Sequence, residues 1–170
     1  MKRKLRVLIS CVLMCVLCCF TALAAEGGNQ PQPRFPGQAC LKSVVAYPAM
    51  AETGKYDRDV STTLKGNMGQ YGDFTLNAAT AAAYRKGGYD AIRVEVTFDR
   101  GDADMYEIYA KGQLVDKGNF WGGYFPGIYE TFTILVPVSN NHADWKIILY
   151  DREDADVHGL PLSGRVTIPQ

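Results

Sequence analysis

The sequence predicts an all-β fold, an antiparallel β-sandwich of about eight strands with one short connecting helix. Short runs rich in Val, Ile, Tyr and Phe recur between residues 91 and 168, and turn residues separate them. Residues 91–98 alternate apolar and polar side chains, the period of two expected of a half-buried strand. Successive strands without long helices between them favour a sandwich over βαβ units.

Residues 1–25 have the three-part pattern of a secretory signal peptide. Basic residues at positions 2, 3, 4 and 6 precede an almost wholly apolar run to Phe20, and small residues follow it. The apolar run is shorter than the roughly 20 residues that a membrane-spanning helix needs. We therefore expect cleavage near Ala24 or Ala25, a secreted or periplasmic location and no retained transmembrane segment.

The chain after the signal peptide divides into a leader and one domain. Residues 26–38 are rich in Gly, Pro and Gln, which is typical of a flexible leader, and residues 39–170 have the length of a single domain. Four of the 18 basic residues lie within 1–25, so 14 basic and 18 acidic residues remain, a net charge of −4. This balance does not favour nucleic-acid binding. Cys40 is the one remaining cysteine, which excludes an internal disulfide, and we expect it to be buried.

The first half of the domain contains the helix. Residues 43–47 predict a strand that ends at Pro48, and residues 49–74 predict loops with one short strand. Asn77, the alanine-rich run 78–86 and the glycines after it match the start and end signals of a short helix.

The second half of the domain carries most of the predicted strands. They are expected at residues 91–98, 105–110, 113–115, 131–137, 145–150 and 165–168. Lys111 and Gly112 predict a tight reversal between two of them. Eight apolar side chains of these strands are predicted to be buried: Ile92, Val94, Val96, Phe132, Ile134, Ile147, Leu149 and Val166.

Two acidic turns lie between predicted strands. They carry Asp99, Asp102 and Asp104 in the first turn and Asp151, Glu153, Asp154 and Asp156 in the second. Hard cations such as calcium take about six to eight oxygen ligands, largely carboxylates and carbonyls on flexible loops. Two such turns at one end of a sandwich would supply them. The alternative is that the turns are rich in Asp because Asp tolerates turn geometry, with the carboxylates in water.

Residues 90–168 resemble part of a C2 domain. Residues 146–153 are similar to that family's hydrophobic strand and Asp-x-Asp calcium loop, and residues 99–106 are similar to its Asp-x-x-Gly-x-Ser-Asp-Pro-Tyr motif, with Met105 in place of the proline. The resemblance implies an eight-stranded sandwich that contacts anionic lipid or a protein partner, and an immunoglobulin-like sandwich is the alternative. It also implies calcium binding at five matching positions: Asp99, Asp104, Asp151, Glu153 and Asp156.

The run 120–129 holds five aromatic residues among glycines and a proline, which predicts a loop. Exposed rings in it would stack on a sugar or lie in a membrane interface. The alternative is a loop that folds back and plugs one end of the sandwich.

No catalytic residue is predicted, and we expect the chain not to be an enzyme. His142 and His158 are the only histidines, and no Gly-x-Ser-x-Gly elbow is present. The sequence therefore predicts an exported binding or accessory module, with calcium in the acidic loops and a protein or membrane surface as partner. The alternatives are a structural or assembly protein of the cell envelope without a metal site, and a small hydrolase.

Overall fold

The computed structural model describes residues 39–123, 127–151 and 159–170, which fall within one compact unit, Arg34–Gln170. In chain order the elements are β1 (Cys40–Ala49), β2 (Thr62–Lys65), β3 (Phe74–Thr75), α2 (Ala78–Lys86), β4 (Ala91–Asp99), β5 (Met105–Ala110), β6 (Gln113–Asn119), β7 (Glu130–Pro137), β8 (His142–Tyr150) and β9 (Leu160–Thr167).

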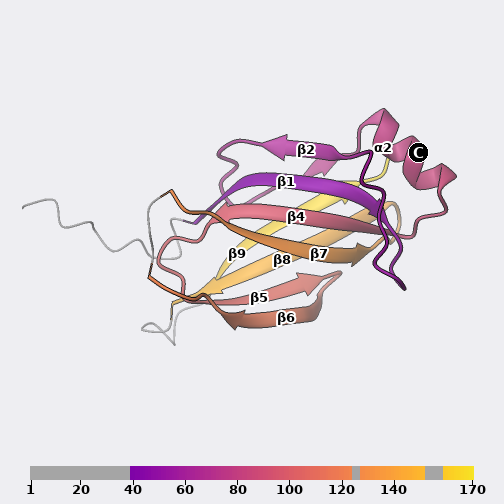
Figure 1. Cartoon of the computed structure of the whole chain (residues 1–170). Coiled ribbons are helices and arrows are strands. Elements are labelled where there is room, and N and C mark those ends of the chain that lie inside the picture. The colour runs from indigo at the N-terminus through magenta and orange to yellow at the C-terminus, as the bar shows by residue number, and fades with distance from the viewer. Residues whose placement is uncertain (1–38, 124–126, 152–158) are drawn as a thin grey trace, which may run out of the picture. The chain divides into compact units, whose positions relative to one another are not determined.

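The strands form two sheets, which confirms the predicted all-β sandwich (Figure 1). One sheet has the order β2-β1-β4-β7 and the other the order β3-β9-β8-β5-β6. All strand pairs in these sheets are antiparallel except β3 with β9. The described residues contain nine strands, one more than the eight expected, because residues 49–75 form two short strands where one was predicted.

The core lies between the two sheets and is built from alternate residues of the long strands. Seven of the eight side chains predicted to be buried are buried: Ile92, Val94, Val96, Ile134, Ile147, Leu149 and Val166. The prediction for Phe132 is wrong, because this ring is only half-buried. It lies on β7, an edge strand, where one flank of the ring lacks a neighbouring strand. There it packs on Tyr106 with 4.5 Å between the ring centroids.

The helix α2 forms where the sequence predicts it. Asn77 is its N-cap, and the Asn77 Oδ1 accepts a hydrogen bond from the Thr80 N–H at 2.9 Å. At the other end, the Gly87 N–H donates to the carbonyl of Ala83, and Arg85 and Lys86 occupy the last turn. Basic side chains there interact favourably with the helix dipole.

The first strand continues through Pro48, contrary to expectation. The Pro48 carbonyl accepts a hydrogen bond from the Asp57 N–H at 3.0 Å, on the edge of β1 away from β4. Since the N–H and C=O of one strand residue point to the same side, the N–H that proline lacks would also face away from β4. β2 pairs only with residues 43–46, so the β1–β2 ladder loses no hydrogen bond at Pro48.

The last strand also begins earlier than predicted, at Leu160 rather than 165. The predicted strand began directly after Gly164, but this glycine lies inside β9, where packing requires it. A Cβ at Gly164 would lie 2.6 Å from the indole Cε2 of Trp145, which pairs with Gly164 across β8 and β9. Close approach of two elements is a common reason for glycine inside a strand.

The predicted reversal at residues 111–112 is confirmed as a two-residue hairpin between β5 and β6. Lys111 has φ 51° and Gly112 has φ 76°, the pair of positive values that a type I′ turn requires.

Cys40, predicted to be buried, is half-buried at the start of β1. Within the described residues, no helix has the length and apolar character needed to cross a membrane.

Candidate functional site

One end of the sandwich brings together the described residues of the two acidic turns and of the aromatic loop. This end, where β4, β6 and β8 finish, is called the loop end, and its described residues are 100–104, 120–123, 127–129 and 151 (Figure 1). Backbone hydrogen bonds join its segments. The Asp104 N–H donates to the Tyr150 carbonyl at 3.0 Å, and the Phe120 N–H donates to the Asp104 carbonyl at 2.8 Å. The first acidic turn therefore ends beside the residue that precedes the second.

Asp99, the last residue of β4, stabilises its own turn. Its Oδ1 accepts a hydrogen bond from the Gly101 N–H at 3.1 Å, and Gly101 adopts a positive φ of 59°. This is the local arrangement in which Asp side chains favour turns. The side chain is almost fully buried, since Asp99 is 9% exposed. One oxygen of this predicted ligand is thus already used within the fold.

Arg100 is a buried cation inside the first acidic turn. It is 6% exposed, and its Nη1 and Nη2 donate to the carbonyls of Ala103 at 2.9 Å and Gly122 at 3.0 Å. Its guanidinium lies 4.7 Å from the ring centroid of Phe120, and its Nε lies 3.7 Å from a carboxylate oxygen of Glu130. Arg100 therefore ties the acidic turn, the start of the aromatic loop and the start of β7 together.

The aromatic loop sends neighbouring side chains in opposite directions. Phe120 is half-buried and packs against Phe98, Tyr106 and Phe132, with ring centroids between 5.2 and 6.4 Å away. Trp121 is 96% exposed. Phe120 thus covers this end of the core, as the plug interpretation expected, but Trp121 does not. The loop's residues 124–126 lie outside the described part.

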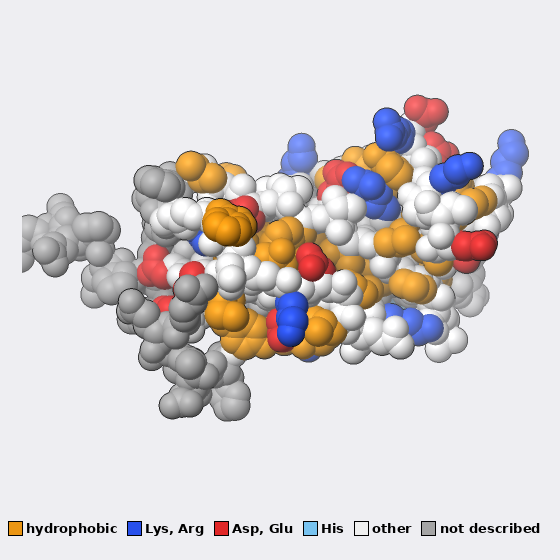
Figure 2. Space-filling model, turned by 60° about the horizontal axis from the view of Figure 1, so that its bottom comes forward, with side chains coloured by type: hydrophobic (Ala, Val, Ile, Leu, Met, Phe, Trp, Pro, Cys, Tyr) orange, Lys and Arg blue, Asp and Glu red, His pale blue; other side chains and the backbone are white. Residues whose placement is uncertain are grey.

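Other apolar side chains of the same loop also face solvent. Ile128 is 62% exposed and Tyr129 47% exposed, and the Lys42 Nζ lies 5.5 Å from the ring centroid of Tyr129. On the face shown in Figure 2, acidic side chains gather beside the grey residues at the loop end, and most Lys and Arg side chains lie farther along the sheets. The loop end therefore combines an apolar tip with carboxylates.

Three of the five predicted calcium ligands are described, and all three lie at the loop end: Asp99, Asp104 and Asp151. Glu153 and Asp156 lie outside the described residues. Within the described ranges, no group of three or more His, Cys, Asp or Glu side chains is placed to hold a metal ion. A calcium site with the predicted ligands would draw at least two of them from residues 152–158.

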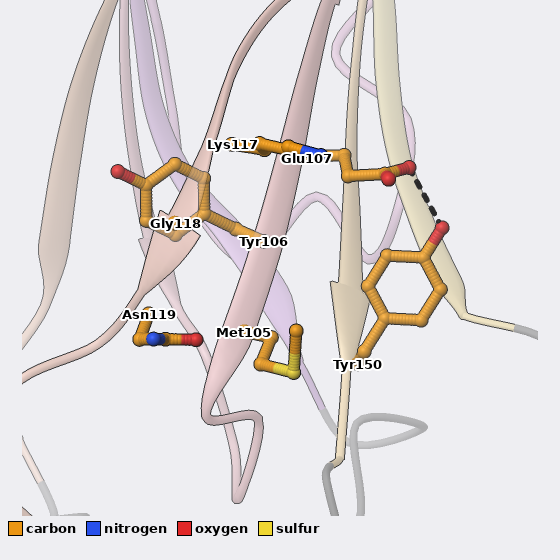
Figure 3. A pocket seen from close by; sticks show the side chains of 7 residues that line it. All are labelled: Met105, Tyr106, Glu107, Lys117, Gly118, Asn119 and Tyr150. Atoms are coloured by element: carbon orange, nitrogen blue, oxygen red, sulfur yellow. Dashed lines mark hydrogen bonds between the residues drawn. The ribbon is translucent and has the colours of Figure 1, made fainter. Parts of the chain in front are cut away.

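A pocket of about 310 Å³ lies near the loop end, on the outer face of the second sheet. It is lined by residues of β5, β6 and β8: Met105, Tyr106, Glu107, Lys117, Gly118, Asn119 and Tyr150 (Figure 3). The strand register explains why five of them meet. Met105 stands opposite both Tyr150 and Asn119, and Glu107 stands opposite Lys117, so these side chains share one face. Tyr106 and Gly118 alternate with them along β5 and β6, and the Tyr106 ring packs on Phe120 and Phe132.

Two tyrosine hydroxyls hold the carboxylate of Glu107. The hydroxyls of Tyr109 and Tyr150 both donate to its Oε2, at 2.7 and 2.9 Å (the Tyr150 bond is dashed in Figure 3). Hydrogen bonds from Tyr109 and Tyr150 lower the pKa of Glu107 below its usual value. Burial and the bond to Glu107 raise the pKa of Tyr150 to about 12. At neutral pH the pocket therefore holds an ionised carboxylate and a neutral phenol.

The histidines have ordinary structural positions where they are described. His142 is the first residue of β8, and its Nδ1 lies 3.3 Å from the Thr167 Oγ1 on β9. The strand predicted here was expected to begin at residue 145, so it starts three residues earlier than predicted. His158 lies outside the described residues.

Sequence reasoning missed Arg100 and the Glu107 pocket. Arg100 appeared to be one charge in an acidic turn, and nothing in the sequence signals its burial. Glu107 and Tyr109 are two residues apart on a predicted strand, so their shared face was predictable. The contribution of Tyr150 was not predictable, because it depends on the register between β5 and β8.

A scan against models of protein families finds no match to the chain, and a search of curated proteins finds none either.

Proposed function

We propose that the chain is an exported binding module whose loop end docks onto an anionic lipid surface through calcium. The observation that carries the proposal is Trp121, which is 96% exposed. The neighbouring Gly122 carbonyl accepts a hydrogen bond from the buried Arg100, so the backbone that presents the indole is fixed to the sandwich. A large exposed ring on a fixed backbone loses little conformational freedom on binding.

The chemistry of the loop end supports a lipid surface as the partner. Tryptophan favours the boundary between water and hydrocarbon, because its body is apolar and its indole N–H is polar. Ile128 and Tyr129, 62% and 47% exposed, add apolar area to the same loop. Large exposed apolar side chains gathered in one loop are a feature of interaction sites on protein surfaces.

The carboxylates explain why calcium belongs to the proposal. The Asp104 N–H donates to the carbonyl of Tyr150, the residue before Asp151, so the backbones of the two aspartates lie close together at the end that bears Trp121. Without a cation they repel an anionic lipid headgroup. Calcium takes oxygen ligands from carboxylates and phosphates alike, so it would bridge the two surfaces. The resemblance of residues 90–168 to a C2 domain supports the same function.

Vesicle binding tests this proposal. Mature protein is mixed with vesicles of phosphatidylserine and phosphatidylcholine in calcium, in magnesium or in chelator, and the bound fraction is measured by co-sedimentation. We expect binding in calcium alone, with a blue shift of tryptophan emission as Trp121 leaves water. Trp121→Ala should weaken binding about tenfold, the effect expected from one buried aromatic side chain. Tyr71→Ala is the matched control, because Tyr71 is 69% exposed on the connection between β2 and β3.

A thermal melt tests the calcium part separately. Calcium at ten times its dissociation constant would add RT ln 11, about 1.4 kcal/mol, to the free energy of unfolding. That increment raises the melting temperature of a domain of this size by roughly 4–8 °C. Asp151→Asn should reduce the shift. Superimposed curves in calcium, magnesium and chelator would rule out the metal site. If vesicle binding persists in chelator, calcium is not needed for docking, and only the role proposed for Trp121 stands.

A further inference from the structure

The pocket on the outer face of β5, β6 and β8 has its own recognition chemistry, separate from the loop end. Its open side is the sheet surface, and its residues come from three adjacent strands (Figure 3). Its volume, about 310 Å³, lies at the lower end of the roughly 300–1,000 Å³ range of small-molecule pockets. A ligand the size of one sugar ring fits this volume, and the open side lets a longer chain continue along the sheet.

The carboxylate of Glu107 is fixed in place and has one oxygen available. Both tyrosine bonds end on Oε2, and among the described residues Oε1 accepts no hydrogen bond. A carboxylate held by two neighbouring hydroxyls loses little freedom when a ligand hydroxyl donates to it. Asn119 and Lys117 add further polar groups to the same pocket. An amide both donates and accepts hydrogen bonds, and an ammonium group donates up to three.

The charges around Glu107 disfavour a charged ligand. Lys117 stands opposite Glu107 in the β5–β6 register, and the Lys146 Nζ lies 4.6 Å from the ring centroid of Tyr109, whose hydroxyl bonds Glu107. Two ammonium groups near one carboxylate oppose a cationic ligand. The carboxylate itself opposes an anionic ligand in direct contact. A neutral ligand with many hydroxyls meets neither repulsion.

The lining also supplies apolar surface. Tyr150 and Met105 lie side by side on adjacent strands, and Met105 is 37% exposed. An aromatic ring beside a carboxylate, an amide and an ammonium group matches the two sides of a pyranose, whose C–H groups form an apolar face and whose hydroxyls form a polar rim. We propose that this pocket binds one residue of a neutral oligosaccharide, with the Glu107 Oε1 accepting from a sugar hydroxyl and Tyr150 packing against the ring. This proposal does not depend on calcium or on lipid docking.

A titration with neutral trisaccharides tests the proposal. Mature, isotope-labelled protein is titrated in chelator with maltotriose, cellotriose and tri-N-acetylchitotriose, and amide shifts are followed by NMR. We expect saturable shifts for at least one probe, confined to residues 105–109, 117–119 and 146–150. Glu107→Gln should weaken that binding roughly tenfold, the loss expected for a hydrogen bond to a charged group. Tyr150→Phe keeps the ring but removes one of the two hydrogen bonds that hold the carboxylate, so it should weaken binding by a smaller factor.

The control is Glu95→Gln, since Glu95 is a half-buried glutamate on the other sheet, bonded to Arg93 at 3.0 Å. It should leave the affinity unchanged. The fold of each variant is checked by its melting temperature, and Tyr150→Phe provides the decisive comparison if Glu107→Gln unfolds. The proposal is overturned if no probe shifts these residues at about 10 mM. That concentration is about a hundred times a dissociation constant of about 0.1 mM, so such a site would be nearly saturated. It is equally overturned if spermidine or tri-galacturonate binds the pocket more tightly than every neutral probe.

Discussion

Replacing Arg100 with methionine should destabilise the fold far more than replacing an exposed arginine. Arg100 is 6% exposed, and its guanidinium donates to two loop carbonyls, those of Ala103 and Gly122. Methionine keeps much of the apolar stem but leaves both carbonyls without this donor. The Ala103 carbonyl belongs to a buried residue, and leaving it unsatisfied costs about 1–3 kcal/mol, whereas the carbonyl of the exposed Gly122 is accessible to water. The lost contact with Phe120 adds about 0.5–1 kcal/mol.

The net change is smaller than the sum, because methionine also removes the cost of burying a charge. We therefore expect the free energy of unfolding to fall by about 1–3 kcal/mol. Arg165→Met is the matched control. Arg165 forms an ion pair with Asp144 at 2.6 Å, but both side chains are about half exposed, at 53% and 49%. Such a surface pair contributes about 0–1 kcal/mol.

Urea unfolding, followed by circular dichroism, measures both variants. The midpoint should drop clearly for Arg100→Met and little for Arg165→Met, with the slope unchanged if both remain two-state. Arg100→Lys should fall between the parent and the methionine variant, because one ammonium group cannot reproduce the planar fork. Equal stabilities for the two methionine variants would show that Arg100 does not hold the loop end together.

Two further predictions concern the second sheet. Gly164→Ala should lower the free energy of unfolding by about 1–3 kcal/mol in a urea melt, because the added Cβ would overlap the indole of Trp145, and an unchanged midpoint would contradict this packing. Glu107→Gln should destabilise the protein less at pH 3 than at pH 7. The hydroxyls of Tyr109 and Tyr150 lower the folded-state pKa of Glu107, so its stabilisation exists above the unfolded pKa near about 4.3 and is lost as pH falls through the folded value. The same loss at both pH values would mean that the carboxylate charge is irrelevant.

The sequence alone determined the elements whose signals are local. The helix 78–86 was predictable because Asn77 caps it and Gly87 ends it, and both act through bonds to residues a few positions away. The buried face of β4 was predictable because a half-buried strand alternates its side chains. The hairpin at Lys111 was predictable because Gly112 adopts a positive φ at no steric cost, as a tight turn between strands requires.

The tertiary structure decided what depends on distant neighbours. Pro48 stays within β1 because its carbonyl side meets the loop residue Asp57 instead of the ladder with β4, and Gly164 is part of a strand because Trp145 packs on it. Neither neighbour is visible from the local pattern. The same reason applies to Glu107: a carboxylate on a strand is usually a solvated group, and it becomes a held acceptor only because pairing of β5 with β8 brings the Tyr150 hydroxyl to 2.9 Å.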